Sequence, residues 1–189
     1  AHRALAQQVY AKHNFDGLRM LAVAQKNEIR EAGAFDTSDE KDMVLLGFIG
    51  FLDPPKQSAA QAITALQEHG VKVVVLTGDS EGVAVKVCSK VGVNTEHCLT
   101  GVDVEAMSDK ALCKAVRECC LFSKLSPAQK QRVVAAFQAN GHTVGYMGDG
   151  INDTLAMRQS DVGISVDSAV DIAKETADII LMKKDLMVL

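Results

Sequence analysis

The stretch Gly148-Asp149-Gly150-Ile151-Asn152-Asp153 decides the fold, because it places two carboxylates and an amide on a glycine-containing turn. The turn follows an apolar segment, residues 142–147, that is typical of a buried strand. In open parallel sheets, ligands sit beyond the carboxyl ends of the strands. Hard oxygen ligands suit Mg²⁺, which binds one or two carboxylates together with waters and phosphate oxygens. The same residues can also form an ordinary polar turn with solvated side chains.

Two better-known loops fail on spacing. An EF-hand beginning at Asp149 requires glycine and glutamate where Thr154 and Ser160 stand. A dinucleotide-binding fingerprint beginning at Gly148 requires a third glycine where Asp153 stands. The turn therefore favours a metal and phosphate site over a calcium loop or a dinucleotide fold.

Two further segments carry candidate chemistry. Thr77-Gly78-Asp79 follows the apolar run 71–76, and it offers a hydroxyl, a flexible glycine and the free N–H groups of a helix start. Lys130 lies in the first turn of a helix whose start, Ser126-Pro127-Ala128-Gln129, forms a capping box. A cation is disfavoured there unless an anion lies nearby. The alternatives are an ordinary strand-to-helix turn and a solvated lysine.

The chain alternates between predicted helices and strands. Repeated β-α units of this length predict an α/β fold, a Rossmann-like parallel sheet with helices on both faces. Helices are predicted near residues 1–13, 59–66, 84–91, 108–118, 126–140 and 168–176, and strands near 18–25, 71–76, 119–123, 142–147, 161–166 and 178–182. The consecutive prolines of Asp53-Pro54-Pro55-Lys56 predict a hinge between two parts of the chain.

Composition excludes several classes of function. The net charge of −4 and an aromatic content of 4% argue against a nucleic-acid partner. The five cysteines are odd in number and contain no C-x-x-C pair, which predicts free thiols rather than disulfides or a zinc site. The longest near-continuous apolar run, residues 43–52, is too short to cross a bilayer, so we expect these 189 residues not to be inserted in a membrane.

Taken in order, four motifs resemble the haloacid-dehalogenase-like superfamily and, within it, the P-type ATPases. They are Asp53-Pro54-Pro55-Lys56, Thr77-Gly78-Asp79, Lys130 and the turn 148–153. The resemblance implies a remnant of the nucleotide-binding domain at residues 1–46 and a phosphorylation domain at residues 47–189. It also implies Mg²⁺ and ATP as cofactors. The segment 163–173 looks most like the magnesium-transporting subgroup.

The resemblance implies a role for each matching residue. Thr77, Gly78 and Asn152 would hold the transferred phosphoryl group, and Lys130 would neutralise its charge. Asp149 would bind Mg²⁺, with Asp153 close by or sharing it. Nucleotide contacts would come from Arg19, Asp79 and Lys124. Thr154 departs from the family pattern, which usually has Ala-Pro-Ala from this position, and this change would loosen the turn without removing the metal ligands.

The family's Asp-Lys-Thr-Gly-Thr motif, which carries the phosphorylated aspartate, occurs nowhere in the sequence. The resemblance implies that it lies upstream of residue 1, so we expect these residues alone to be inactive and to expose a sheet edge or cleft. The implied partner is the rest of the same polypeptide, with its transmembrane, actuator and nucleotide-binding segments, at the cytosolic face of a membrane. A soluble phosphatase of the superfamily and a non-enzymatic Mg²⁺- or nucleotide-binding module are the alternatives.

Overall fold

The computed structural model describes residues 2–26, 36–51, 55–183 and 185–189. It divides into two compact units, Ala1–Asp53 and Pro54–Leu189. Strand β2 (Val44–Phe51) pairs with strand β1 (Arg19–Gln25), with one register shift between Val23 and Ala24, and so belongs to the first unit. The predicted division between residues 46 and 47 into two functional domains stays a prediction.

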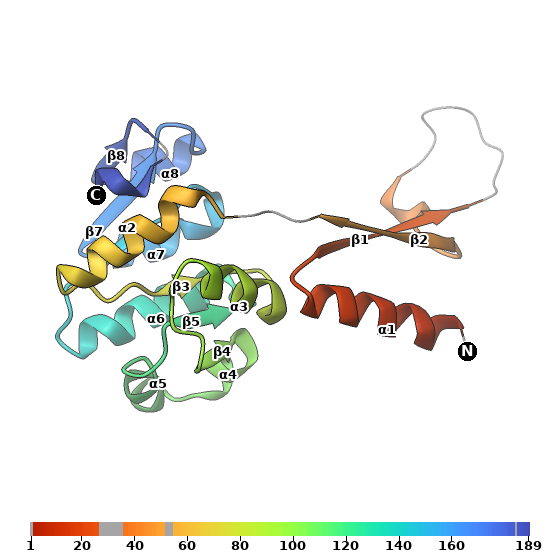
Figure 1. Cartoon of the computed structure of the whole chain (residues 1–189), viewed down its shortest axis with the longest axis horizontal. Coiled ribbons are helices and arrows are strands. Elements are labelled where there is room, and N and C mark those ends of the chain that lie inside the picture. The colour runs from red at the N-terminus through yellow and green to blue at the C-terminus, as the bar shows by residue number, and fades with distance from the viewer. Residues whose placement is uncertain (1, 27–35, 52–54, 184) are drawn as a thin grey trace. The chain divides into compact units, whose positions relative to one another are not determined.

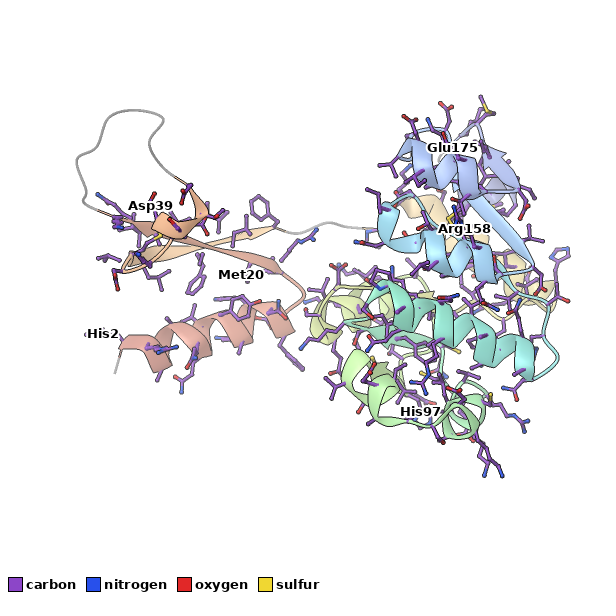
Figure 2. The ribbon with its side chains drawn as sticks, turned by 180° about the vertical axis from the view of Figure 1, so that it is seen from behind. His2, Met20, Asp39, His97, Arg158 and Glu175 are labelled. Atoms are coloured by element: carbon purple, nitrogen blue, oxygen red, sulfur yellow. The ribbon has the colours of Figure 1, made fainter. Side chains whose placement is uncertain are left out.

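The first unit joins helix α1 (His2–Phe15) to the antiparallel strands β1 and β2, with a short 3₁₀ turn, η1 (Thr37–Asp39), before β2. Side chains project from both faces of the strand pair (Figure 2). Of the residues described in this unit, only Gly17 is buried. Two strands and one helix are too few to enclose a core, so large apolar side chains such as Phe15, Leu46 and Ile49 stay exposed. That this unit is a remnant of a nucleotide-binding domain stays a prediction.

The second unit is an α/β domain that confirms the predicted fold class (Figure 1). All its strand pairs are parallel, and they form two sheets with the orders β3-β5-β4 and β6-β7-β8. The strands are β3 (Val75–Leu76), β4 (Cys98–Thr100), β5 (Leu121–Ser123), β6 (Gly145–Met147), β7 (Val162–Val166) and β8 (Ile179–Leu181). The helices are α2 (Gln57–Glu68), α3 (Glu81–Lys90), α4 (Gly101–Ala106), α5 (Asp109–Ala115), α6 (Pro127–Ala139), α7 (Thr154–Gln159) and α8 (Asp171–Thr176), with 3₁₀ turns η2 (Ile151–Asp153) and η3 (Leu186–Val188).

Helices cover both faces of the first sheet, as consecutive residues of β5 show. Successive side chains of a strand point to opposite faces. Phe122 packs into a core with Leu112 of α5 and Val133 of α6, whereas Leu121 packs with Ile63 of α2 and Cys88 of α3. Both β5 side chains are fully buried. The consecutive apolar residues Leu121 and Phe122 of the central strand are therefore explained by burial on both sides.

Helix α6 connects the two sheets. Leu76 of β3 and Val144, just before β6, both pack against the core around Phe122 and also against the core formed by Val134, Tyr146 and Met157. Within the described residues, no strand pairs with the remaining edge of β3 or with the remaining edge of β6. The sheet expected to be continuous thus consists of two three-stranded halves, and β3 and β6 are each one of the two edge strands of their half.

The prediction from the sequence lacked one β-α unit and made two strands too long. Strand β4 and helix α4 fall in a segment with no predicted element, because three-residue strands carry no readable periodicity. Strands β3 and β6 are shorter than the predicted runs 71–76 and 142–147, since only their last residues have a pairing partner. No helix in the described part of the chain is long and apolar enough to cross a membrane.

The five cysteines are free, as the sequence predicts. Cys88 is 2% exposed, and burial, with a smaller effect of nearby Cys98, raises the pKa of its thiol from 9.0 to about 11. A raised pKa means that the folded chain holds this proton after the unfolded chain has lost it. The resulting stabilisation is complete below pH 9 and is lost as the pH rises towards 11.

We therefore expect the free energy of unfolding to fall between pH 9 and pH 11, and to fall less steeply in a Cys88→Ala variant. Urea denaturation at a series of pH values measures both slopes. Identical slopes for the two proteins would show that Cys88 does not contribute.

Candidate active site

A cleft of about 470 Å³ lies in the second unit where β3 and β6 end. Four of the predicted site residues line it: Thr77 after β3, Lys130 on α6, and Asp149 and Asp153 after β6. Its remaining wall includes Pro55, Lys56, Ala59, Tyr146, Met147, Gly148, Asp185 and Leu186. The four predicted residues, of which Thr77 and Asp153 lie 76 positions apart in the sequence, thus meet at the carboxyl ends of two parallel strands, where ligands are expected.

The Thr77 loop is fixed by its backbone. The Thr77 amide donates to the carbonyl oxygen of Phe122 at 2.9 Å, and the Leu125 amide donates to the Thr77 carbonyl at 3.0 Å. The Thr77 hydroxyl accepts a hydrogen bond from the Asp79 amide at 3.0 Å. A Cβ added to Gly78 would meet only the Leu125 carbonyl oxygen, at 3.7 Å, which is an ordinary contact. Packing within the chain therefore does not require glycine at residue 78. A ligand bound close to the backbone there would require it.

Lys130 is a buried charge rather than a solvated one. The predicted capping box starts α6, because the Ser126 hydroxyl accepts from the Gln129 amide and the Gln129 side chain accepts from the Ser126 amide. Lys130 follows in the first turn and is 7% exposed. Its Nζ donates to Asp153 Oδ1 at 2.7 Å. The anion expected near this lysine is thus present within the chain, and the solvated-surface interpretation is wrong.

Tyr146 is a site residue that the sequence analysis missed. Its hydroxyl donates to the same Asp153 Oδ1 at 2.9 Å. Burial, followed by the negative charge of Asp153, raises the pKa of Tyr146 far above its ordinary value, so the phenol keeps its proton. No local signal in the sequence indicated this role, because an aromatic residue in a strand is usually part of the core.

The turn after β6 is held close to Asp153. The Gly148 amide donates to the Ile164 carbonyl at 3.1 Å, and the buried Ser165 hydroxyl donates to the Gly148 carbonyl at 2.9 Å. A Cβ added to Gly148 would collide with the Asp153 side chain. Glycine is therefore required at residue 148 so that the Asp153 carboxylate can lie against the turn.

The carboxylates in the cleft suit Mg²⁺. Asp149 and Asp153 both line the cleft, and no group of three or more histidine, cysteine or acidic residues arranged to hold a metal exists among the residues described. Mg²⁺ commonly uses one or two protein carboxylates and leaves its other positions to water and phosphate oxygens. Asp153 Oδ2, unlike Oδ1, accepts no hydrogen bond from described residues, and it faces the Gly148–Gly150 turn. The carboxylates of Asp149 and Asp153, together with the Oδ2 atom of Asp153, fit the predicted Mg²⁺.

The other predicted site residues lie outside the cleft wall. Gly78, Asp79 and Asn152 are exposed, with Asn152 on η2. Lys124 borders a separate hollow of about 490 Å³ beside α4, and its amide donates to the Asp79 carbonyl at 2.9 Å. Arg19 begins β1 in the first unit. The roles predicted for these five residues stay predictions.

The fold and the cleft define a class of protein. A model of haloacid dehalogenase-like hydrolases matches residues 3–161, and the chain belongs to that family. The parallel α/β architecture with flanking helices agrees with the match.

Individual relatives show which members of the family the chain is similar to. The chain is 51% identical over 180 residues to "Magnesium-transporting ATPase, P-type 1" of Salmonella typhimurium, covering 94% of this chain and 20% of the relative. It is 50% identical over 176 residues to the Escherichia coli (strain K12) protein of the same name, covering 93% of this chain and 20% of the relative. "Endoplasmic reticulum calcium ATPase srcA" of Aspergillus fumigatus is 32% identical over 179 residues, covering 87% of this chain and 18% of the relative. The chain therefore spans about a fifth of the length of these relatives.

We expect Lys130→Ala to lower the free energy of unfolding by about 3 kcal/mol, because it leaves the largely buried Asp153 carboxylate without its cation. The matched control is Lys174→Ala, which removes an exposed lysine paired with Asp171 at 3.1 Å and should cost less than about 0.5 kcal/mol. Urea denaturation measures both. Equal losses in the two variants would contradict a special role for the Lys130–Asp153 pair.

Proposed function

We propose that this chain is the phosphoryl-transfer part of a P-type ATPase that moves cations, with Mg²⁺ as the transported ion. The observation that carries this proposal is the cleft, in which Thr77, Lys130, Asp149 and Asp153 converge between two unpaired strand edges. Phosphoryl transfer depends mainly on positioning and on neutralising charge, and a hydroxyl, a buried cation and two carboxylates supply both. The magnesium-transporting relatives support the choice of ion.

In this proposal each cleft residue has one task. The Thr77 hydroxyl and the open space at Gly78 receive the transferred phosphoryl group, and Asn152 donates to it from η2. Lys130 neutralises its charge. Asp149 and Asp153 would hold a Mg²⁺, which would supply further positive charge to the site. Because Lys130 pairs with Asp153 at 2.7 Å, its positive charge is held at the cleft wall before a phosphoryl group arrives.

The acceptor aspartate comes, in our proposal, from a segment outside these 189 residues. Parallel neighbouring strands lie about 4.8 Å apart and satisfy each other's backbone groups. The free edges of β3 and β6, linked by α6, offer hydrogen-bonding groups to one additional strand. An aspartate at the end of such a strand would enter the cleft beside Thr77 and Asp149. The γ-phosphoryl group of ATP passes to this carboxylate with release of ADP, and then to water, which frees the carboxylate and releases inorganic phosphate.

Nucleotide binding and transport belong to the larger protein. We propose that the first unit is part of the nucleotide-binding domain, where Arg19 contacts ATP phosphates, and that Asp79 and Lys124 face the nucleotide from the second unit. The remaining polypeptide supplies the transmembrane, actuator and other nucleotide-binding segments, with this part on the cytosolic side. The identity of about one half to magnesium-transporting P-type ATPases favours this function over a soluble phosphatase or a simple binding module.

We expect Asp149→Asn to weaken Mn²⁺ binding to the chain by about 100-fold or more, because the loss of residues that merely support a ligand already costs about 10- to 100-fold. Mn²⁺ can replace Mg²⁺ at sites made of oxygen ligands, and electron paramagnetic resonance measures how much of it is free and how much is bound. The control is Asp171→Asn, an exposed aspartate on α8 whose loss should leave the affinity unchanged. Equal affinities for the unaltered chain and Asp149→Asn would contradict the proposed metal site.

A further inference from the structure

We propose that Tyr146 is a positioning residue that fixes the Asp153 carboxylate for Mg²⁺. Its hydroxyl and Lys130 together hold Oδ1, so that Oδ2 is presented to the metal. The inference rests on the proposed function, because it concerns the same metal site. It adds Tyr146 to the site and gives the two oxygens of Asp153 different roles, Oδ1 as hydrogen-bond acceptor and Oδ2 as metal ligand.

The Oδ1 side of the carboxylate is fully used. Lys130 Nζ donates at 2.7 Å from α6, and the Tyr146 hydroxyl donates at 2.9 Å from β6. A carboxylate oxygen accepts about two hydrogen bonds, so these two donors occupy it. Since they come from different elements, they fix both the direction and the rotation of the Asp153 side chain.

The Oδ2 atom lies against the glycine-containing turn. It is 3.2 Å from the place where a Gly148 side chain would begin, which is a tight contact, and 3.7 Å from the corresponding place at Gly150. It accepts no hydrogen bond within the part of the chain that the structure describes. Because residues 148 and 150 are both glycine, the space between the turn and Oδ2 is free of side chains.

The Tyr146 hydroxyl has no packing function that a phenylalanine would lack. The residue is 8% exposed, and its ring packs against Val134, Ala156 and Met157, which are all apolar. A buried hydroxyl is costly unless it is hydrogen-bonded, and Asp153 is its partner here. The oxygen atom of this side chain is therefore accounted for by Asp153 alone.

The test is a Tyr146→Phe variant of the 189-residue chain, titrated with Mn²⁺ by electron paramagnetic resonance. We expect the Mn²⁺ dissociation constant to rise about tenfold, at the lower end of what is lost when a residue supporting a metal ligand is removed. The matched control is Tyr10→Phe at the other tyrosine of the sequence, which is 45% exposed on α1 and should bind Mn²⁺ as the unaltered chain does. Circular dichroism at the titration temperature establishes that each variant is folded.

Affinity separates positioning from structural support. A purely structural role would lower the melting temperature of Tyr146→Phe while leaving the Mn²⁺ affinity of the folded variant unchanged, and that result would overturn the inference alone. If the unaltered chain shows no saturable Mn²⁺ binding, the metal site of the proposed function fails, and this inference fails with it. A tenfold loss confined to Tyr146→Phe supports both.

Discussion

The second unit depends on one buried ion pair, between Lys130 and Asp153. It joins the first turn of α6 to the turn after β6, across 23 residues of sequence, and Tyr146 adds a third contact from the strand itself. A buried ion pair often stabilises a core no more than apolar residues of similar volume do, because both charges lose their hydration. Here it keeps a cation and a carboxylate ready at the carboxyl ends of β3 and β6. The same pair thus explains the burial of Lys130, the glycine at residue 148 and the shape of the cleft.

The cleft also reflects how the two sheets meet. Helix α6 lies under both, and Leu76 and Val144 bring the edges of β3 and β6 to the same core. Unpaired edge strands are normally covered or shortened, because they invite pairing with other chains. In this protein both edges are only two or three residues long and border the site. Because these edges are short, they offer few groups for unwanted pairing with other chains. Their position suits one added strand that carries the acceptor aspartate.

The sequence predicted the turn 148–153, the capped helix of Lys130 and the α/β class, because each of these has a local signature of glycine, capping residues or apolar period. It did not predict the contact between Lys130 and Asp153, since no local pattern links residues on different elements. Tyr146 was missed because an aromatic residue in a strand is usually core, and its hydroxyl function appears only once Asp153 is placed. Strand β4 and helix α4 are too short to have a periodic signal, and the pairing of residues 47–51 with β1 is a contact between separate segments that no local pattern marks.

The most direct measurement of the central claim is phosphoryl transfer from Mg[γ-³²P]ATP to this chain with and without an added strand. An apolar strand ending in Asp-Lys-Thr-Gly-Thr would be joined to the chain by a flexible linker, and acid-stable, hydroxylamine-sensitive label would be counted. The account predicts no label on the chain alone and label on the aspartate of the joined strand, lost again when that aspartate is changed to asparagine. Label of the same kind on the chain without the strand would contradict the account.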